Sequence, residues 1–451
     1  MALVKTPKSQ QQLDRLSAAL ESGTFVDVKR MLNGLPAHDV AHLLESSPPK
    51  FRHTLWRMVD RENEGEVINE LNDELRVHFL SDMNASEVAH ITEHLEDDDV
   101  ADILQQLPDA VTREVLEAMD HHDRARIERV LQYPDDTAGG LMNTDTITVR
   151  PSLTLDVVLR YLRRHEEIPK MTDSLFVVNR NDQFIGLLPL RTLLVSDASA
   201  TVREMMDTNI EAIPAYMPDD QVARLFEGND WVSAPVIGDS GQLVGRITID
   251  DVVDVIREDA DHSLTSMAGL EEDLDTFAPV FRTASRRAIW LGINLLTAFL
   301  ASSVINIFQG TIEKVVALAV LMPIVASMGG IAGTQTLTVL VRGIALGHVT
   351  PKNGWWLINR EVAVGILNGM LWACVVGLAA SAWFDDWHLG LIIAAAMVIN
   401  LVTACLTGAM LPLLLKRIDI DPALAGGVVL TTVTDVVGFV SFLGLATWFY
   451  G

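Results

Sequence analysis

The chain has 451 residues and combines a positive mean hydropathy of +0.25 with a formal net charge of −26. Residues 285–451 hold seven acidic and eight basic residues, whereas residues 1–284 hold 53 acidic and 26 basic ones. These values exclude a small single-domain soluble protein, and the negative charge leads us to expect no nucleic-acid partner. The acidic surplus concentrates cations, and it is equally typical of adaptation for solubility or to a salty habitat.

The N-terminal segment MALVKTPKSQ is polar and lacks the apolar core of a signal peptide. The first long apolar stretch begins only after about 280 residues, so we expect the acidic part to stay in the cytosol. Cys374 and Cys405 both fall within apolar stretches. We interpret them as small packing residues rather than as a disulfide.

Residues 1–136 read as short amphipathic helices with a loose internal repeat. The segments VAHLLE (40–45), VAHITE (88–93) and VADILQ (100–105) resemble one another, and prolines punctuate the pattern. This arrangement predicts a cytosolic helical solenoid in which each repeat leaves one polar face free to meet a partner.

Residues 137–258 contain a second duplication, with mixed α and β character. Segment 141–149 matches 205–213, and segment 176–186 matches 235–245. Each half predicts strand, helix, strand, turn, strand, helix. The pattern resembles a tandem pair of CBS domains, which occur in enzymes and transporters alike and so do not name the activity. Residues 259–284 then form an acidic, helix-prone connector, expected to act as a plug helix.

Residues 285–451 predict a transmembrane domain of five helices, each long enough to cross a hydrocarbon core of ~30 Å. Basic residues gather before the first helix, between the second and third, and after the fourth. The distribution places the N-terminus in the cytosol and the C-terminus outside. The apolar stretches are 288–308, 314–341, 361–384, 389–415 and 424–449.

The second apolar stretch carries a glycine-rich segment at 323–335, PIVASMGGIAGTQ. Gly329, Gly330 and Gly333 weaken helix packing and permit close backbone approach, so we expect the helix to be interrupted there and to line a cavity. The alternative is small-residue packing between helices.

Asp435 lies near the middle of the fifth stretch, which has no basic residue to pair with it. An ionised carboxylate there costs about 2.5–3.5 kcal/mol, so it should face water or a cation. Magnesium is typically held through one or two carboxylates with much of its water shell intact. The hydroxyls of Thr431, Thr432 and Thr434 would complete such a site, whereas a structural aspartate or a proton relay remain alternatives.

The order of solenoid, CBS pair, connector and five membrane helices resembles the MgtE family of magnesium channels or transporters. The motifs that carry the resemblance are 323–335, RGIALG at 342–347, and 421–438 with Asp435. The resemblance implies a homodimer in the cell inner membrane with one pore at its two-fold axis. Helices two and five would line that pore, with Asp435 as the ion-binding carboxylate. Many members have Asn where this chain has Ile331, so selectivity here is expected to differ.

The resemblance also implies regulation by cytosolic Mg²⁺. Bare acidic faces of the solenoid, the CBS pair and the connector would repel one another, and bound Mg²⁺ would bridge them and close the pore. For any single carboxylate a solvated surface position is the simpler interpretation, so the prediction rests on the cluster. The candidates are Asp98, Asp102, Asp250, Asp251, Asp254, Glu258, Asp259 and Asp261.

Two further motifs suggest other ligands. The CBS pair could bind ATP through Arg191, although members that do so carry Asp at the next position, where this chain has Thr192. Segment 90–94, HITEH, fits the H-x-x-E-H pattern of some zinc peptidases and would place two His and a Glu on one helical face. A surface coincidence is the alternative that we prefer, and we expect no enzyme.

The sequence therefore predicts Mg²⁺ uptake through a channel or transporter that cytosolic Mg²⁺ closes. The alternative is a CBS-regulated transporter of another divalent cation, proton-coupled through Asp435.

Overall fold

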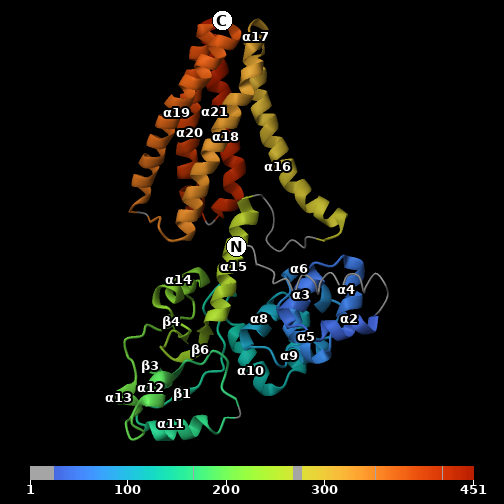
Figure 1. Cartoon of the computed structure of the whole chain (residues 1–451), viewed down its shortest axis with the longest axis vertical. Coiled ribbons are helices and arrows are strands. Elements are labelled where there is room, and N and C mark those ends of the chain that lie inside the picture. Colours follow the sequence, from blue (N-terminus) through green and yellow to red (C-terminus); the bar gives the residue numbers. More distant parts are fainter. Residues whose placement is uncertain (1–24, 166, 268–276, 351, 419, 451) are drawn as a thin grey trace. The chain divides into compact units, whose positions relative to one another are not determined.

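Figure 1 shows the computed structural model, which describes residues 25–165, 167–267, 277–350, 352–418 and 420–450. The chain forms two compact units. The first extends to Ala260, and the second contains the residues that follow Ala260 in the same helix and the chain from Val280 onward. Solenoid, CBS pair and long apolar helices are all present, as the sequence predicts.

The N-terminal region is a series of short helices around a core of Leu, Val and Ile side chains. Val40, Val88 and Val100, which begin the three repeat segments, are all buried in this core. The helices are α2 (Phe25–Leu32), α3 (Ala37–Glu45), α4 (Pro49–Trp56), η1 (Arg61–Asn63), α5 (Glu64–Asn69), α6 (Asp73–Leu80), α7 (Ala85–Ile91), α8 (Asp97–Gln105), α9 (Asp109–Ala118) and α10 (His121–Val130).

Two arginines end helices of the solenoid in the same way. Arg52 is buried, and its Nε donates to the carbonyl oxygen of Leu44 at 3.1 Å, at the end of α3. Arg76 donates from Nη2 to the carbonyl oxygen of Asn69 at 2.8 Å, at the end of α5. A cation that binds the last carbonyl oxygens of a helix stabilises that end. The internal repeat of the solenoid therefore includes these two arginine-capped helix ends.

The CBS pair consists of two equivalent three-stranded sheets. In each sheet the first strand pairs parallel with the second, and the second pairs antiparallel with the third, with a register shift at the equivalent step. The predicted turns occur where Asp182 and Gly241 adopt positive φ values of 58° and 75°. The elements are β1 (Thr148–Val149), α11 (Leu155–Leu162), β2 (Ser174–Val178), β3 (Phe184–Pro189), α12 (Leu190–Val195), α13 (Val202–Met205), β4 (Ile213–Pro214), α14 (Asp219–Asn229), β5 (Ser233–Ile237), β6 (Leu243–Thr248) and α15 (Ile249–Met267).

The solenoid packs onto the second CBS half. Ala101 of α8 and Val130 of α10 share one buried cluster with Phe226 of α14 and Val252 of α15. The first turn of α8 is thereby held close to the first turn of α15. Helix α15 runs across position 258, where the sequence suggested a division between the CBS pair and the connector.

The second unit contains five helices long and apolar enough to span a membrane, counted over its described residues. Helix α20 lies among α18, α19 and α21 and packs against all three (Figure 1). Its buried face includes several Ala and Gly residues. The helices are α16 (Val280–Ile307), the short α17 (Gln309–Lys314), α18 (Ala317–Ala345), α19 (Gly354–Phe384), α20 (Trp387–Arg417) and α21 (Pro422–Tyr450).

The predicted interruption of the second membrane helix is wrong. Helix α18 is continuous from Ala317 to Ala345, with Pro323 inside it. Gly329 and Gly333 are instead sites of close helix packing: a Cβ on Gly329 would lie 2.3 Å from Asn400 Nδ2, and one on Gly333 would lie 2.9 Å from Leu430 Cδ1. Small-residue packing, the alternative interpretation, explains these glycines.

Candidate functional site

Asp435 is half-buried on α21, and no hydrogen bond or charged neighbour engages it among the described residues. Glu361 of α19 differs, because Arg360 Nη1 lies 2.9 Å from its Oε1 and Thr336 Oγ1 lies 3.5 Å from its Oε2. Among the described residues of the spanning helices, Asp435 and Glu361 are the only acidic side chains. Asp435 is therefore the carboxylate that the protein leaves available to a cation or to water.

The threonines around Asp435 occupy different faces of α21. Thr431 is exposed and lies one turn before Asp435 on the same face, with its Oγ1 donating to the carbonyl oxygen of Gly427 at 3.0 Å. Thr434 is completely buried and donates to the carbonyl oxygen of Thr431 at 3.0 Å. The structure therefore places Thr431 on the same face as Asp435, whereas Thr434 is buried inside the helix bundle.

The three glycines that were predicted to line the pore lie in different environments. Gly329 and Gly333 pack against α20 and α21, whereas a Cβ on Gly330 would meet nothing within 4 Å. Ile331 follows Gly330 and is 54% exposed. Gly330 and Ile331 thus lie on a face of α18 that the described part of this single chain leaves open.

In the first unit, Asp98 of α8 is 5% exposed, and its Oδ1 has no hydrogen-bond partner among the described residues. Burial raises its pKa well above the usual range, and the charges of Asp251, Asp99 and Asp102 raise it further. Burial and the neighbouring Asp250 raise the pKa of Asp251 to about 7. Carboxylates of the solenoid therefore lie close to carboxylates of the CBS pair in a buried environment, where their negative charges are unfavourable.

The cluster includes Asp99, which the sequence prediction did not name, beside the predicted Asp102. Burial is the main cause that raises the pKa of Asp99 to about 6 and that of Asp102 to about 7. Asp97, the first residue of the acidic run, is different because it is paired: Arg126 Nη2 lies 2.8 Å from its Oδ1, and Thr144 donates to its Oδ2. The run 97–99 in the first turn of α8 was the available signal for the whole cluster.

Helix α15 begins in this cluster with a local cap. The backbone N–H and the Oγ1 of Thr248 donate to Asp251 Oδ2 at 3.1 Å and 2.9 Å, and the hydroxyl also bonds Asp250. A side chain three residues into a helix that binds the capping residue is a familiar N-terminal arrangement. It fixes the Asp251 carboxylate opposite α8.

The other predicted regulatory acids lie farther along α15. Asp254 pairs with Arg257 at 3.1 Å, and Glu258 adds to the field around Asp102. Asp259 adds to the field around Asp219, whose pKa burial raises to about 6. Asp261 is exposed and belongs to the second unit. Of the predicted regulatory acids, Asp98, Asp102, Asp250 and Asp251 thus lie near one another, with Glu258 at their margin.

Within the described residues, no three His, Cys, Asp or Glu side chains are arranged to hold a metal ion directly. Magnesium often retains several waters and uses one or two carboxylates, so the donor chemistry of Asp98 and Asp251 is compatible with a hydrated ion. Oxygen donors, negative charge and an unpartnered buried oxygen all fit that ion.

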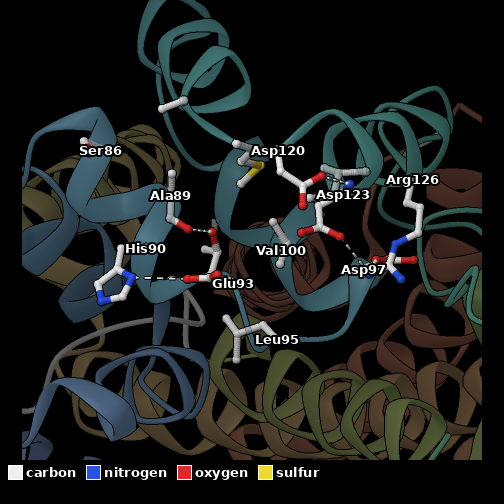
Figure 2. Close-up of a pocket in the computed structure, with 14 residues that line it drawn as sticks. Ser86, Ala89, His90, Glu93, Leu95, Asp97, Val100, Asp120, Asp123 and Arg126 are labelled. Atoms are coloured by element: carbon white, nitrogen blue, oxygen red, sulfur yellow. Dashed lines mark hydrogen bonds and ion pairs between the residues drawn. The ribbon is translucent and has the colours of Figure 1, made fainter. Parts of the chain in front are cut away.

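The HITEH prediction of a common helical face is wrong. Helix α7 ends at Ile91, so Glu93 and His94 lie in the turn that follows. Figure 2 shows His90 and Glu93, whose Nδ1 and Oε2 are 3.3 Å apart, at a cavity of about 320 Å³. His94 does not line this cavity. Arg191, the predicted nucleotide contact, is exposed on α12.

The raised pKa values predict how Mg²⁺ affects stability. A carboxyl whose pKa is higher in the folded state stabilises the fold fully below about pH 4, and this contribution is lost as the pH rises through about 7. A Mg²⁺ ion bound by these groups would compete with protons for them, so we expect Mg²⁺ to raise the melting temperature of the full-length protein more at about pH 8 than at about pH 5. Thermal unfolding in detergent measures this difference, and equal shifts at both pH values would contradict the assignment.

Comparison with known proteins adds the family. Sequence models match the chain at residues 322–445 (MgtE, divalent cation transporter), 35–136 (MgtE intracellular N domain), and 138–198 and 202–258 (CBS domain). The magnesium transporter MgtE of Bacillus subtilis is 27% identical over 435 residues, which cover 96% of each chain. The magnesium transporter MgtE of Thermus thermophilus is 29% identical over 442 residues, which cover 96% of this chain and 97% of that protein.

The chain belongs to the MgtE family. This is a family of magnesium transporters with a CBS regulatory domain, rather than of enzymes. The cytosolic domain of the Mg²⁺ channel MgtE, solved in complex with ATP, resembles this MgtE-family chain with a TM-score of 0.50 and 29% identity. That match covers 54% of this chain and 99% of the solved domain. The five apolar helices make this MgtE-family chain a membrane protein.

Proposed function

We propose that the chain is a magnesium channel or transporter that mediates Mg²⁺ uptake past Asp435 and that cytosolic Mg²⁺ closes. The observation that carries the ion path is Asp435, a half-buried carboxylate inside an apolar helix without a partner among the described residues. A hydrated Mg²⁺ satisfies such a group without a cage of protein ligands. Thr431 on the same face adds a hydroxyl oxygen.

The proposed assembly is a homodimer with one pore at its two-fold axis. Gly330, Ile331, Thr431 and Asp435 lie on faces of α18 and α21 that remain open or partly open in one chain. A second copy would close a path between these faces and bring two Asp435 carboxylates to it. Basic residues near the predicted cytosolic loops support an N-terminus inside and a C-terminus outside the inner membrane.

The proposed sensor is the carboxylate cluster of Asp98, Asp102, Asp250 and Asp251, with Glu258 at its margin. Bare, these carboxylates repel, whereas a bound divalent cation joins the solenoid to α15. The last turns of α15 carry His262, whose Nε2 lies 3.2 Å from Asp421 Oδ2 just before α21. The proposed domains are 1–136, 137–258, 259–284 and 285–451.

Arg191 supports a nucleotide proposal only as an exposed cation on α12. The related cytosolic domain was solved with ATP. We propose ATP as a second ligand of the CBS pair.

The test of the proposed function uses the full-length protein in proteoliposomes. We expect Mg²⁺ influx when magnesium on the cytosolic side is low, and at least about tenfold less influx when it is raised to millimolar levels, since ~1.4 kcal/mol of linkage suffices for tenfold. A pH-sensitive dye reports protons in the same vesicles. Influx that ignores cytosolic Mg²⁺ would refute the sensor, and influx that stops without a proton gradient would favour the proton-coupled alternative.

A further inference from the structure

Asn400 is a polar side chain at the centre of the apolar helix bundle. It lies on α20, is 0% exposed, and its neighbours Met397 and Leu401 belong to the main apolar cluster of the second unit. Its Nδ2 donates to the carbonyl oxygen of Val325 in α18 at 2.8 Å. Because a carbonyl oxygen can only accept, the NH₂ end must face Val325. The Oδ1 is buried without a hydrogen-bond partner among the described residues.

The shape of the site depends on two glycines from different helices. A Cβ on Gly329 of α18 would lie 2.3 Å from Asn400 Nδ2, and one on Gly438 of α21 would lie 2.8 Å from the same atom. The carboxamide therefore fills the space that the two missing side chains leave. Val325 closes the site, with its Cγ1 3.3 Å from the same Gly438 position.

This junction lies beside the proposed ion site. Gly438 follows Asp435 by three residues, so the two are neighbours on the surface of α21, about 4.5 Å apart along its axis. Gly329 likewise precedes Gly330 and Ile331, which lie on the open face of α18. Any change in the spacing of α18 and α21 at Asn400 therefore moves the Asp435 carboxylate relative to Gly330 and Ile331 on α18.

We propose that Asn400 is a positioning residue that sets ion selectivity, because its carboxamide fixes the spacing of α18 and α21 at the level of Asp435. The inference rests on the proposed function, in which the ion passes Asp435. Mg²⁺ keeps a rigid octahedral water shell, whereas Ca²⁺ accepts variable geometry. A path of fixed width discriminates between these two hydrated ions, and a loosened path does not.

The experiment measures Mg²⁺ and Ca²⁺ influx of full-length variants in proteoliposomes. Asn400→Ala is expected to lower the ratio of Mg²⁺ to Ca²⁺ influx about tenfold, equivalent to ~1.4 kcal/mol of lost discrimination. Asn400→Leu, which fills the space without the hydrogen bond, is expected to lower it similarly and serves if the alanine variant does not fold. Gly444→Ala on α21 is the matched control, because its Cβ would meet nothing within 4 Å.

A compensating substitution tests the contact itself. Gly329→Ala is expected to lower influx and the Mg²⁺ to Ca²⁺ ratio in the native background, where its methyl group collides with Asn400. In the Asn400→Ala background the same methyl group fills the space and should raise the ratio. A general loss of stability would not reverse the sign of the effect, because two destabilising substitutions would then lower the ratio further when combined.

Asp435→Ala in the same preparation separates the two proposals. If Asp435→Ala abolishes influx while folded Asn400→Leu retains the native ratio, the positioning role is refuted and the ion path stands. An identical effect of Gly329→Ala in both backgrounds refutes the positioning role as well. If Asp435→Ala retains native influx, the ion path itself is refuted.

Discussion

Replacing Asp435 by alanine is expected to reduce Mg²⁺ influx by about 100-fold. The carboxylate has no partner among the described residues to compensate for its burial, and in the proposed function the passing cation is that partner. Removing one member of a buried charged pair costs about 3 kcal/mol, which corresponds to roughly 100-fold in a rate or a binding constant. Influx into proteoliposomes at low cytosolic Mg²⁺ measures this loss, since the proposed sensor would then leave the ion path open.

Two further substitutions show which property of Asp435 matters. Asp435→Asn keeps the shape and removes the charge, so it should lose nearly as much influx as alanine. Asp385→Asn removes an exposed acid from the loop between α19 and α20 and should retain native influx. Near-native influx in Asp435→Asn would mean that the charge is not required. A proton relay and a cation site both need that charge, so such a result would count against both.

The membrane helices were predictable because their signal is local. Length and hydropathy alone predict spanning segments, and all five are present. The prediction for the glycine-rich segment was wrong because glycine in a sequence indicates only that a side chain is missing. A broken helix and a close helix contact both use that absence, and the contacts that decide between them, Asn400 and Leu430, lie about 70 to 100 residues farther along the chain.

The candidate site was predictable where a residue conflicts with its own surroundings. Asp435 conflicts with an apolar stretch, so the sequence alone singled it out. Asp98 does not conflict with its acidic neighbours, and only folding reveals that it is buried while the adjacent Asp97 is paired with Arg126. Burial depends on the packing of α8 against the second CBS half, which involves residues more than 100 positions apart. Pattern alone cannot rank members of such an acidic run.

If the proposed sensor controls influx, replacing Asp98 by asparagine is expected to raise the half-closing concentration, the cytosolic Mg²⁺ concentration that halves influx, by about tenfold or more. Asp98 contributes a buried oxygen without a partner among the described residues, and its charge is opposed by Asp251 across the contact between solenoid and α15. The variant keeps the shape and loses one charged ligand, a change of about 1.5–3 kcal/mol for hydrogen-bonded charges. Influx at graded cytosolic Mg²⁺ gives the half-closing concentration.

The control must remove the same charge from the same domain without touching the cluster. Asp109 is exposed at the start of α9, so Asp109→Asn removes the same one negative charge from the solenoid and should leave the half-closing concentration unchanged. Asp251→Asn retains an oxygen that can accept from Thr248, so its cap persists while the opposing charge is lost, and it should match Asp98→Asn. If Asp109→Asn shifts the response as much as Asp98→Asn, the diffuse acidity of residues 1–284 senses Mg²⁺, and the buried pair has no special role.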